Sequence, residues 1–488
     1  MKKLLLAVAG VLVVGVAVIL ARTLMLSPGG TTEGARVEIP VDAEAVARRM
    51  SEAIRFRTIS RQRGQASDRA PMDAFIEWLA RAYPRASSEI GFERVGGYSL
   101  LFTWRGSDPS LAPILLTAHY DVVPVIPGSE DQWQHPPFAG EIADGYVWGR
   151  GALDDKSAVI AQLEAATLLL EAGFQPLRTV YLAFGHDEER GGSEGAAAIT
   201  ELLRSRGVQL AWSLDEGSFV VEGVFPGVAA PVASINVAEK GYVSIELVAR
   251  GQGGHSSMPP RETAVGVLAA AIVKVQDHPM PGGIEGLVAE SFDALAPHLP
   301  FVPRMLFANR WLFGGLLESI LTARSPGLNA MVRTTTAPTM LSGSVKENVL
   351  PIEAVATVNF RLHPRDSPDD VVAHVTRAVG DDRVEVRPRG PGGPASAVSS
   401  TTSEGFAHIS ASVGDVMGHA IVIPGLTVGG TDSRHYGQIA DDAYRFNPMV
   451  VTAADISGFH GTNERISIEN LVLGTRIYAR LIQRAAGP

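Results

Sequence analysis

The sequence predicts an α/β fold with a mostly parallel central sheet and a smaller α+β domain inserted into it. Three continuous apolar runs, at 112–118, 179–184 and 210–214, have the length and composition of strands that helices cover on both faces. Between the first two runs, Ser157–Ala172 has a helical pattern that ends at Gly173. This alternation of buried strands and helices is typical of a layered α/β domain.

Length and composition limit the classes of protein to which the chain can belong. With 488 residues, 46% hydrophobic and 19% charged, it is long enough for two packed domains and too apolar to be disordered. The formal net charge of −10 at pH 7 argues against nucleic-acid binding, which usually needs a basic face. The absence of cysteine excludes disulfides and thiolate ligands, so any metal must be bound by His, Asp or Glu.

The first residues form a separate, strongly apolar segment. Two lysines precede an uncharged run from Leu4 to Ala21, which is long for a signal peptide and just long enough to cross a bilayer. We interpret residues 1–26 as a signal anchor with the lysines on the inner side; a cleaved signal peptide is the alternative. Either interpretation predicts an exported protein. Residues 27–40, rich in Gly and Thr, are expected to be a linker.

The larger domain is expected to be discontinuous in sequence. Its first part, 41–235, begins with helices at Ala43–Ile54 and Met72–Tyr83. Residues 236–388 have the pattern of an inserted α+β domain, and 389–488 return through a Gly-, Pro- and Ser-rich stretch to the α/β pattern. The strands and helices expected in the inserted domain are Tyr242–Arg250, Glu262–Gln276, Met340–Ser344, Ala354–Leu362 and Pro368–Val379.

Acidic and imidazole side chains follow several predicted strands at their carboxyl ends. In open α/β sheets ligands bind beyond these ends, so such residues are expected to meet in one site. A single one of them is more often a helix cap or a solvated charge, but the whole group favours a metal centre. The expected metal ligands are His119, Asp154, Glu189, Asp215 and His460.

Neighbouring carboxylates suit the other tasks of a two-metal hydrolytic site. Asp154 lies in a glycine-rich loop before a helix, where a bridging ligand is expected. Asp121, two residues after His119, is expected to orient that imidazole. Glu188 and Glu189 are adjacent, so one can bind metal while the other acts as the general base.

Six short motifs resemble those of the di-zinc aminoacylase and carboxypeptidase metallopeptidases. This family includes carboxypeptidase S, the bacterial glutamate carboxypeptidase and succinyl-diaminopimelate desuccinylase. The resemblance extends over nearly all of 42–485 and implies a zinc-peptidase-type catalytic domain with an inserted lid or dimerisation domain. The motifs are Thr117–Pro124, Gly149–Lys156, Asp187–Glu189, Asp215–Gly217, Gly253–Ser257 and Phe459–Glu464.

The same resemblance implies two Zn²⁺ ions per subunit, with Co²⁺ or Mn²⁺ as substitutes. It places His119 and Asp215 on one ion, Glu189 and His460 on the other, and Asp154 between the two. Zinc is inferred here from the family and from the ligand types, not from the spacing of the residues.

Catalytic and substrate-binding roles are implied as well. By the resemblance, Glu188 is expected to be the general base, and Asp121 is expected to orient the imidazole of His119. His255, in the inserted domain, is expected to reach across a homodimer and polarise the substrate carbonyl, as an oxyanion-hole donor would. Asn348 and Arg361 match substrate-contacting positions of the lid, and the planar guanidinium of Arg361 is suited to a carboxylate.

The segment from Phe301 to Met340 resembles the carboxypeptidase S branch, which includes an N-fatty-acyl-amino-acid synthase/hydrolase. Its apolar part, Phe301–Leu321, is expected either to line an acyl pocket or to lie against lipid. Additional core or dimer helices are an equally good interpretation of that run.

Together these features predict a zinc-dependent amidohydrolase that cleaves N-acyl amino acids or small peptides with a free carboxylate. A strict dipeptidase or carboxypeptidase is one alternative, and a catalytically silent metal-binding module of the same fold is another. The expected partners are a small-molecule or short peptide substrate, the membrane through the N-terminal segment and a second copy of the chain, but no nucleic acid. The catalytic domain is expected outside the cytoplasm.

Overall fold

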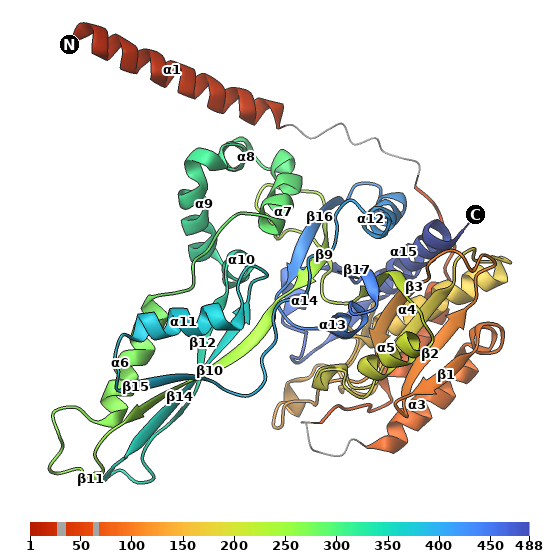
Figure 1. Ribbon diagram of the computed structural model, residues 1–488. Coiled ribbons are helices and arrows are strands. Elements are labelled where there is room, and N and C mark those ends of the chain that lie inside the picture. The colour runs from red at the N-terminus through yellow and green to blue at the C-terminus, as the bar shows by residue number, and fades with distance from the viewer. Residues whose placement is uncertain (27–35, 62–67, 488) are drawn as a thin grey trace.

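A ten-stranded mixed sheet organises the larger domain in the computed structural model, which describes residues 1–26, 36–61 and 68–487 (Figure 1). Most of the expected linker, 27–35, lies outside the described residues. Nine strands of the sheet form one row, and the tenth, β16 (Ile421–Thr427), pairs with β9 beside that row. The order of the row is β1 (Phe92–Val95), β2 (Ser99–Trp104), β6 (Val180–Gly185), β3 (Ile114–His119), β7 (Leu210–Asp215), β17 (Ala440–Arg445), β9 (Val232–Glu239), β8 (Val220–Val221) and β18 (Val450–Val451).

The three predicted apolar runs form adjacent parallel strands in the middle of this sheet. β6 pairs with β3, and β3 with β7, in parallel register. The side chains of these strands are almost all buried, as expected for strands that helices cover on both faces. Because the strands are parallel, their carboxyl ends meet at one edge, where His119 ends β3 and Asp215 ends β7. The predicted α/β class with a mostly parallel centre is confirmed.

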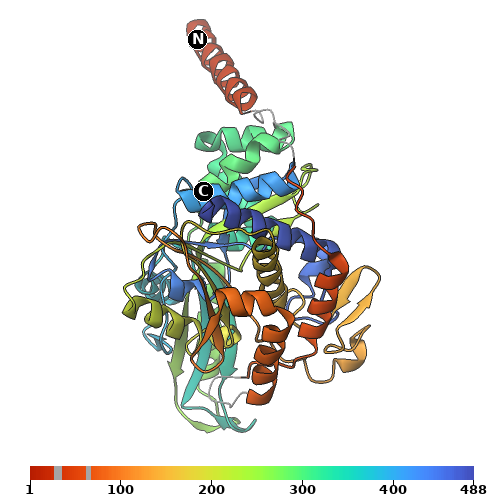
Figure 2. The ribbon, with the colours of Figure 1, turned by 90° about the vertical axis from the view of Figure 1, so that its right-hand side faces the viewer.

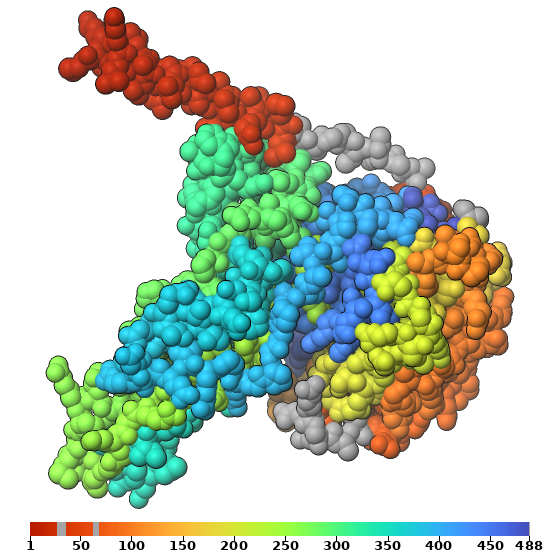
Figure 3. Space-filling view, viewed as in Figure 1, coloured from red at the N-terminus to blue at the C-terminus, as the bar shows by residue number. Residues whose placement is uncertain are grey.

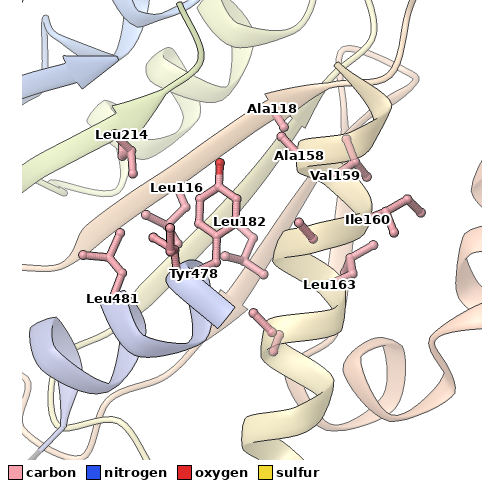
Figure 4. Close-up of a cluster of buried hydrophobic side chains, with 14 of the residues drawn as sticks. Leu116, Ala118, Ala158, Val159, Ile160, Leu163, Leu182, Leu214, Tyr478 and Leu481 are labelled. Carbon is pink, nitrogen blue, oxygen red and sulfur yellow. The ribbon is translucent and has the colours of Figure 1, made fainter. Parts of the chain in front are cut away.

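Helices cover both faces of the sheet and supply most of its core. Figure 4 shows Leu116, Leu182 and Leu214 of the central strands packed against Val159 and Tyr478 of two of these helices. One face is covered by α2 (Ala43–Ile54), α4 (Lys156–Glu171), α12 (Glu404–Met417) and α15 (Ile468–Ala486), and the other by α5 (Ala196–Ser205) and α13 (Ser433–Tyr436). Helix α3 (Arg69–Ala82) packs at the edge of this core.

A second, antiparallel sheet forms the inserted domain. Its order is β12 (Thr335–Ser342), β14 (Glu353–Leu362), β10 (Gly241–Arg250) and β15 (Val384–Pro388), and helices α6 (Ala264–Asp277) and α11 (Pro368–Val379) pack on it. Alternate residues of β10 and β14, such as Ile245 and Val358, fill a separate apolar core. The antiparallel sheet begins at Gly241, whereas β9, up to Glu239, still belongs to the larger sheet.

Two small antiparallel sheets complete the described strands. The ribbon of β11 (Gly254–His255) and β13 (Val349–Leu350) lies at the tip of the inserted domain, far from the large sheet (Figure 1). The other sheet contains β4 (Glu141–Ala143), β5 (Tyr146–Trp148) and β19 (Arg465–Ser467). The short helix α14 (Ala453–Ile456) precedes β19 and the segment that contains His460.

The inserted segment also contains a helical unit that the α+β pattern did not predict. It has its own apolar core, in which the rings of Phe292 and Phe307 stack with centroids 4.6 Å apart. Its first helix, α7 (Leu287–Leu295), packs on β16 of the large sheet. The unit consists of α7 (Leu287–Leu295), α8 (Phe301–Ala308), α9 (Arg310–Arg324) and α10 (Pro326–Val332).

The N-terminal segment is a helix that extends away from the rest of the protein (Figure 2). This helix, α1 (Lys2–Met25), is long and apolar enough to cross a membrane, and the apolar window that meets this criterion is not buried in the protein. These properties fit a signal anchor and a signal peptide equally well.

Candidate metal centre

His119 occupies the point where three carboxylates meet. As the last residue of β3 it is 1% exposed, and its Nε2 lies 2.9 Å from Asp154 Oδ1 and 3.3 Å from Glu216 Oε1. The other ring nitrogen, Nδ1, lies 2.9 Å from the carbonyl oxygen of Asp121. An Nδ1–H that donates to this carbonyl leaves Nε2 free to bind a cation.

Asp154 stands between the two histidines of the centre. Its Oδ1 faces His119 and its Oδ2 lies 3.0 Å from Nε2 of His460. His460 Nε2 is in turn 3.5 Å from Glu189 Oε2. One carboxylate that presents a different oxygen to each histidine has the geometry of a bridging ligand between two ions.

The candidate ligand atoms form two groups that share Asp154. One contains His119, Asp154 and Glu216, the other Asp154, Glu189 and His460, and in each group the ligand atoms lie within 4.8 Å of one another. Four of the five ligands expected from the sequence are therefore brought together.

Asp215 differs from the expectation, because its neighbour Glu216 completes the first group. Successive side chains of a strand point to opposite sides, so these two adjacent carboxylates at the end of β7 diverge. Asp215 is 3% exposed and its Oδ1 accepts a hydrogen bond from the backbone N–H of Glu216 at 2.9 Å. Its Oδ2 has no hydrogen-bond partner among the described residues.

The buried Asp121 connects the first histidine with the loop that contains the expected base. Its Oδ1 and Oδ2 accept hydrogen bonds from the backbone N–H groups of Glu188 and Glu189, at 3.1 and 3.3 Å. Its Oδ1 is also 3.4 Å from His119 Nδ1. Asp121 thus fixes the position of two functional segments, the end of β3 and the Glu188–Glu189 turn, relative to each other.

The electrostatics of the centre favour bound cations. Burial, together with the Asp154 carboxylate, raises the pKa of Glu216 to about 7, and burial also raises the pKa of Glu188 well above its ordinary value. Hydrogen bonds to Asp154 and Glu189 raise the pKa of His460 to about 10. Carboxylates that repel one another at such short range need compensating positive charge, and His, Asp and Glu are the ligands that suit a pair of divalent cations such as zinc.

A buried ion pair fixes the two loops that carry Asp154 and His460. Glu464 is completely buried and lies 2.5 Å from Arg150 Nη1. Its carboxylate also accepts hydrogen bonds from the backbone N–H groups of Gly151, Leu153 and Asp154, at 2.8–3.2 Å. Arg150 Nη2 donates to the carbonyl oxygen of His460 at 3.2 Å. One salt bridge therefore positions residues from both metal-ligand groups.

The centre opens into a cavity of about 1050 Å³ that lies between the two large domains. Its lining combines the acidic centre with basic side chains, including Arg361, whose guanidinium lies 5.2 Å from the ring centroid of Tyr242. The two residues are direct partners on β14 and β10. The other lining residues relevant to chemistry are Asp154, Glu188, Glu189, Glu216, Lys240, Arg434 and His460.

Two expected site residues are placed elsewhere. His255 is exposed on β11, where its Nδ1 accepts a hydrogen bond from the Ser257 backbone at 3.1 Å. Asn348 immediately precedes β13 of the same ribbon. Neither residue is among those that line the cavity, so a single copy of the chain does not bring them to the metal centre.

Sequence reasoning missed three residues of the site. Glu216 follows the predicted ligand Asp215 directly, and its signal was the Asp-Glu pair at a strand end. Glu464 lies within a motif that was singled out for His460 alone. Lys240 lines the cavity and donates to the carbonyl oxygens of Ala330 and Arg333, at 2.9 and 2.8 Å; nothing in the sequence pattern distinguished it from a surface lysine.

Comparison with known proteins gives consistent matches. The sequence profile of Peptidase family M20/M25/M40 matches residues 115–484. The N-fatty-acyl-amino acid synthase/hydrolase of Xenopus tropicalis is 41% identical over 483 residues, which is 97% of this chain and 93% of that protein. The probable carboxypeptidase S-like 2 of Dictyostelium discoideum is 40% identical over 443 residues, covering 90% and 84% of the two chains.

A similar fold occurs among solved structures. The M20 family metallo-carboxypeptidase of Sulfolobus solfataricus aligns with a TM-score of 0.63 at 19% identity, over 90% of this chain and 98% of that chain. At this identity the likeness concerns the fold alone.

Proposed function

Because the chain belongs to the peptidase family M20/M25/M40 and is a hydrolytic enzyme that acts on amide bonds, we propose that it cleaves N-acyl amino acids or short peptides that carry a free carboxylate. One observation carries this proposal: the shared Asp154 of the two ligand groups and Arg361 line the same cavity. The cavity thus combines a centre suited to attack an amide with a cation suited to bind the adjacent carboxylate.

Two divalent cations, by preference zinc, would be held by His119, Glu216, Asp154, Glu189 and His460. When bound, they supply Lewis acidity toward the substrate carbonyl and lower the pKa of water. Removal of metal with a chelator should abolish hydrolysis, and addition of Zn²⁺ should restore it.

The protein's own side chains then handle the proton. Glu188 takes a proton from the attacking water and gives it to the nitrogen of the departing amine, so that the C–N bond breaks as the amine becomes neutral. Its burial favours this role, because the raised pKa of the carboxyl makes it a better proton acceptor than an exposed glutamate. Asp121 keeps the Glu188 backbone in place throughout.

Replacing Glu216 by Gln should weaken metal binding more than replacing Asp215 by Asn. The reason is the orientation of the two side chains, since Glu216 Oε1 is 3.3 Å from His119 Nε2 whereas Asp215 belongs to neither ligand group. Loss of even an outer-shell partner costs about 10–100-fold in metal affinity, and loss of a ligand should cost at least as much. Metal content per chain and competition with a chelator measure the difference; a larger defect in Asp215→Asn would restore Asp215 as the ligand.

Replacing Arg361 by Met should raise KM for substrates with a free carboxylate by about 10–100-fold, because a hydrogen bond to a charged group contributes about 1.5–3 kcal/mol. The value of kcat should change little, since Arg361 lies on β14 and none of the candidate metal ligands lies on that strand. Steady-state kinetics on a substrate and on its carboxamide analogue test this role. The wild-type enzyme should discriminate between the two and Arg361→Met should not; equal discrimination by both enzymes would contradict the assignment.

The group on the acyl side of the cleaved amide is either a fatty-acyl chain or an amino-acid residue of a peptide. The similarity to an N-fatty-acyl-amino acid synthase/hydrolase favours a long acyl chain, and the similarity to carboxypeptidase S-like proteins favours a peptide. Assays of the purified protein with an N-fatty-acyl amino acid and with a dipeptide separate these activities. Hydrolysis of neither by the metal-loaded protein would overturn the proposed function and favour the silent metal-binding module.

A second copy of the chain would complete the site. His255 and Asn348 lie together on the β11–β13 ribbon, outside the cavity, as expected of residues that act in the site of a partner. We propose a homodimer in which His255 donates to the substrate carbonyl oxygen. Mixing inactive Glu188→Gln with inactive His255→Ala should restore part of the activity if each site uses both chains.

The N-terminal helix supports membrane attachment of an exported enzyme. We propose that α1 is retained as a signal anchor and that the catalytic domain faces the extracytoplasmic side, as the two lysines before the apolar run favour.

A further inference from the structure

The helical unit exposes an apolar surface that lies beside α1. Five large side chains of α8 and α9 are between 43% and 64% exposed. The helices that carry them are the part of the globular body nearest α1 (Figures 1 and 3). We call this surface the α8–α9 face and define it by Phe301, Val302, Trp311, Leu312 and Leu316.

The α8–α9 face lacks the charges that a water-facing helix normally carries. The other exposed positions of α9 are Gly315, Ser319 and Ala323, which are small or hydroxylated, and the last residue of the helix, Arg324. Of the charged side chains of these two helices, Arg310 and Glu318 are held in ion pairs with Asp293 and Arg333, Arg304 is partly buried, and Arg324 is exposed at the C-terminal end of α9. A surface helix in water places charged residues opposite its buried stripe, so this face is adapted to an apolar environment.

Specific contacts join this surface to the end of α1. The buried Asn309 donates from Nδ2 to the carbonyl oxygen of Ile19 and to Thr23 Oγ1, both at 3.3 Å. Arg22 Nε donates to the carbonyl oxygen of Ala308 at 3.0 Å. The C-terminal turns of α1 are thus fixed to the junction between α8 and α9, two residues before Trp311.

The position of α1 fixes the level at which a bilayer would lie. An α-helix rises about 1.5 Å per residue, so the apolar part of α1 is just long enough to span the hydrocarbon layer. If it does, the bilayer surface lies close to Arg22, and therefore at the level of Ala308. Trp311 and Leu312 follow three and four residues later in sequence, and tryptophan is favoured at this interface. The large sheet and the β11–β13 ribbon lie farther from α1 (Figure 1).

We propose that the α8–α9 face inserts into the surface of the same bilayer that α1 spans, so that the enzyme has a second, monotopic contact with lipid. This inference rests on the proposed anchoring by α1. Burial of several aliphatic and aromatic side chains stabilises such a contact, and it would hold the catalytic domain in one orientation relative to the bilayer.

Single cysteines give a direct test, since the native chain has none. Leu312→Cys and Leu316→Cys report on the face, and Ile142→Cys on β4 is the matched control because Ile142 is 49% exposed and Leu316 is 52% exposed. The full-length variants are labelled with an environment-sensitive dye and reconstituted in phosphatidylcholine vesicles. We expect lipid-borne quenchers to act on positions 312 and 316 and aqueous iodide to act on position 142.

The native tryptophans allow the same measurement without a label. Of the six tryptophans only Trp311 is strongly exposed, at 64%, whereas the other five are at most 8% exposed. Brominated phosphatidylcholine should therefore quench part of the emission of the unlabelled protein, and Trp311→Phe should remove that part.

Each contrary outcome is informative. Equal iodide quenching at 312, 316 and 142 in vesicles overturns the proposed lipid contact. Protection of 312 and 316 that rises with the protein-to-lipid ratio also overturns it, because a second copy then covers the face. Alkaline extraction reports on α1 separately: if the protein is washed off, the proposed anchoring fails, and if it remains while the labels stay aqueous, only this inference fails. Hydrolysis of a soluble substrate, which tests the proposed enzyme activity, should be unchanged in all three cysteine variants.

Discussion

Glu188→Gln is expected to lower kcat/KM by about 10²–10⁴-fold, the usual contribution of a general acid–base group, while the metal content stays unchanged. Glutamine has the same shape but cannot accept the proton of the attacking water. Glu188 lines the cavity beside both ligand groups and belongs to neither. Its backbone N–H remains bonded to Asp121, so the loop should keep its position. Steady-state kinetics and elemental analysis of the same preparation give the two readouts.

The matched control for this variant is Glu194→Gln. Glu194 lies six residues further along, its side chain is 62% exposed, and it pairs with Arg190 at 3.2 Å. A surface pair of this kind contributes little, so activity and metal content should remain those of the wild type. If instead Glu188→Gln loses metal and Glu189→Gln keeps it, the roles of base and ligand are exchanged between these neighbours.

The sequence predicted the sheet because its strands are covered on both faces. A strand buried on both sides must be apolar along its whole length, and the three runs 112–118, 179–184 and 210–214 satisfied that condition. Because the strands are parallel, the residues that follow them share one edge, which is why His119 and Glu189 could be predicted to meet. His460 follows no such apolar run, and it was predicted to join the centre from its residue type and from the Phe459–Glu464 motif that contains it.

The choice between Asp215 and Glu216 could not be made from the sequence. Both are acidic and both stand at the end of β7. Which of the two side chains faces His119 depends on the residue at which the side chains of the strand cease to point alternately to its two faces. That point is set by tertiary contacts, here the hydrogen bond from Phe446 N–H to the Asp215 carbonyl oxygen at 2.7 Å. A shift of one residue exchanges the two side chains.

The helical unit shows a second limit of sequence reasoning. A largely apolar stretch such as Phe301–Leu321 fits an acyl pocket, a core helix, a dimer contact or a lipid contact. The structure shows which side chains are used internally, for example Phe307 and Leu317 in the small core, and which are left outside, such as Trp311 and Leu316. The proposed lipid contact depends on this separation between buried and exposed side chains.

Glu464→Ala is expected to destabilise the fold by about 3–5 kcal/mol, because it leaves the Arg150 cation buried without its partner. Glu464 is 0% and Arg150 1% exposed, so neither charge can be solvated by a small movement. Thermal or denaturant unfolding of the metal-free protein measures the loss. The comparison variant is Glu93→Ala, which breaks an exposed pair with Arg206 (side chains 41% and 43% exposed) and should cost less than about 1 kcal/mol.

A double variant, Arg150→Met with Glu464→Met, separates stability from positioning. Replacing both charges of a buried pair by apolar residues of similar size is often close to neutral, so much of the lost stability should return. Metal affinity should not return, because the backbone N–H groups of Gly151, Leu153 and Asp154 still lack the carboxylate that holds the bridging residue in place. If the double variant binds metal as tightly as the wild type, the pair merely stabilises the fold. If it is stable and binds metal weakly, Glu464 is a positioning residue of the metal centre, acting through Asp154 without contacting an ion.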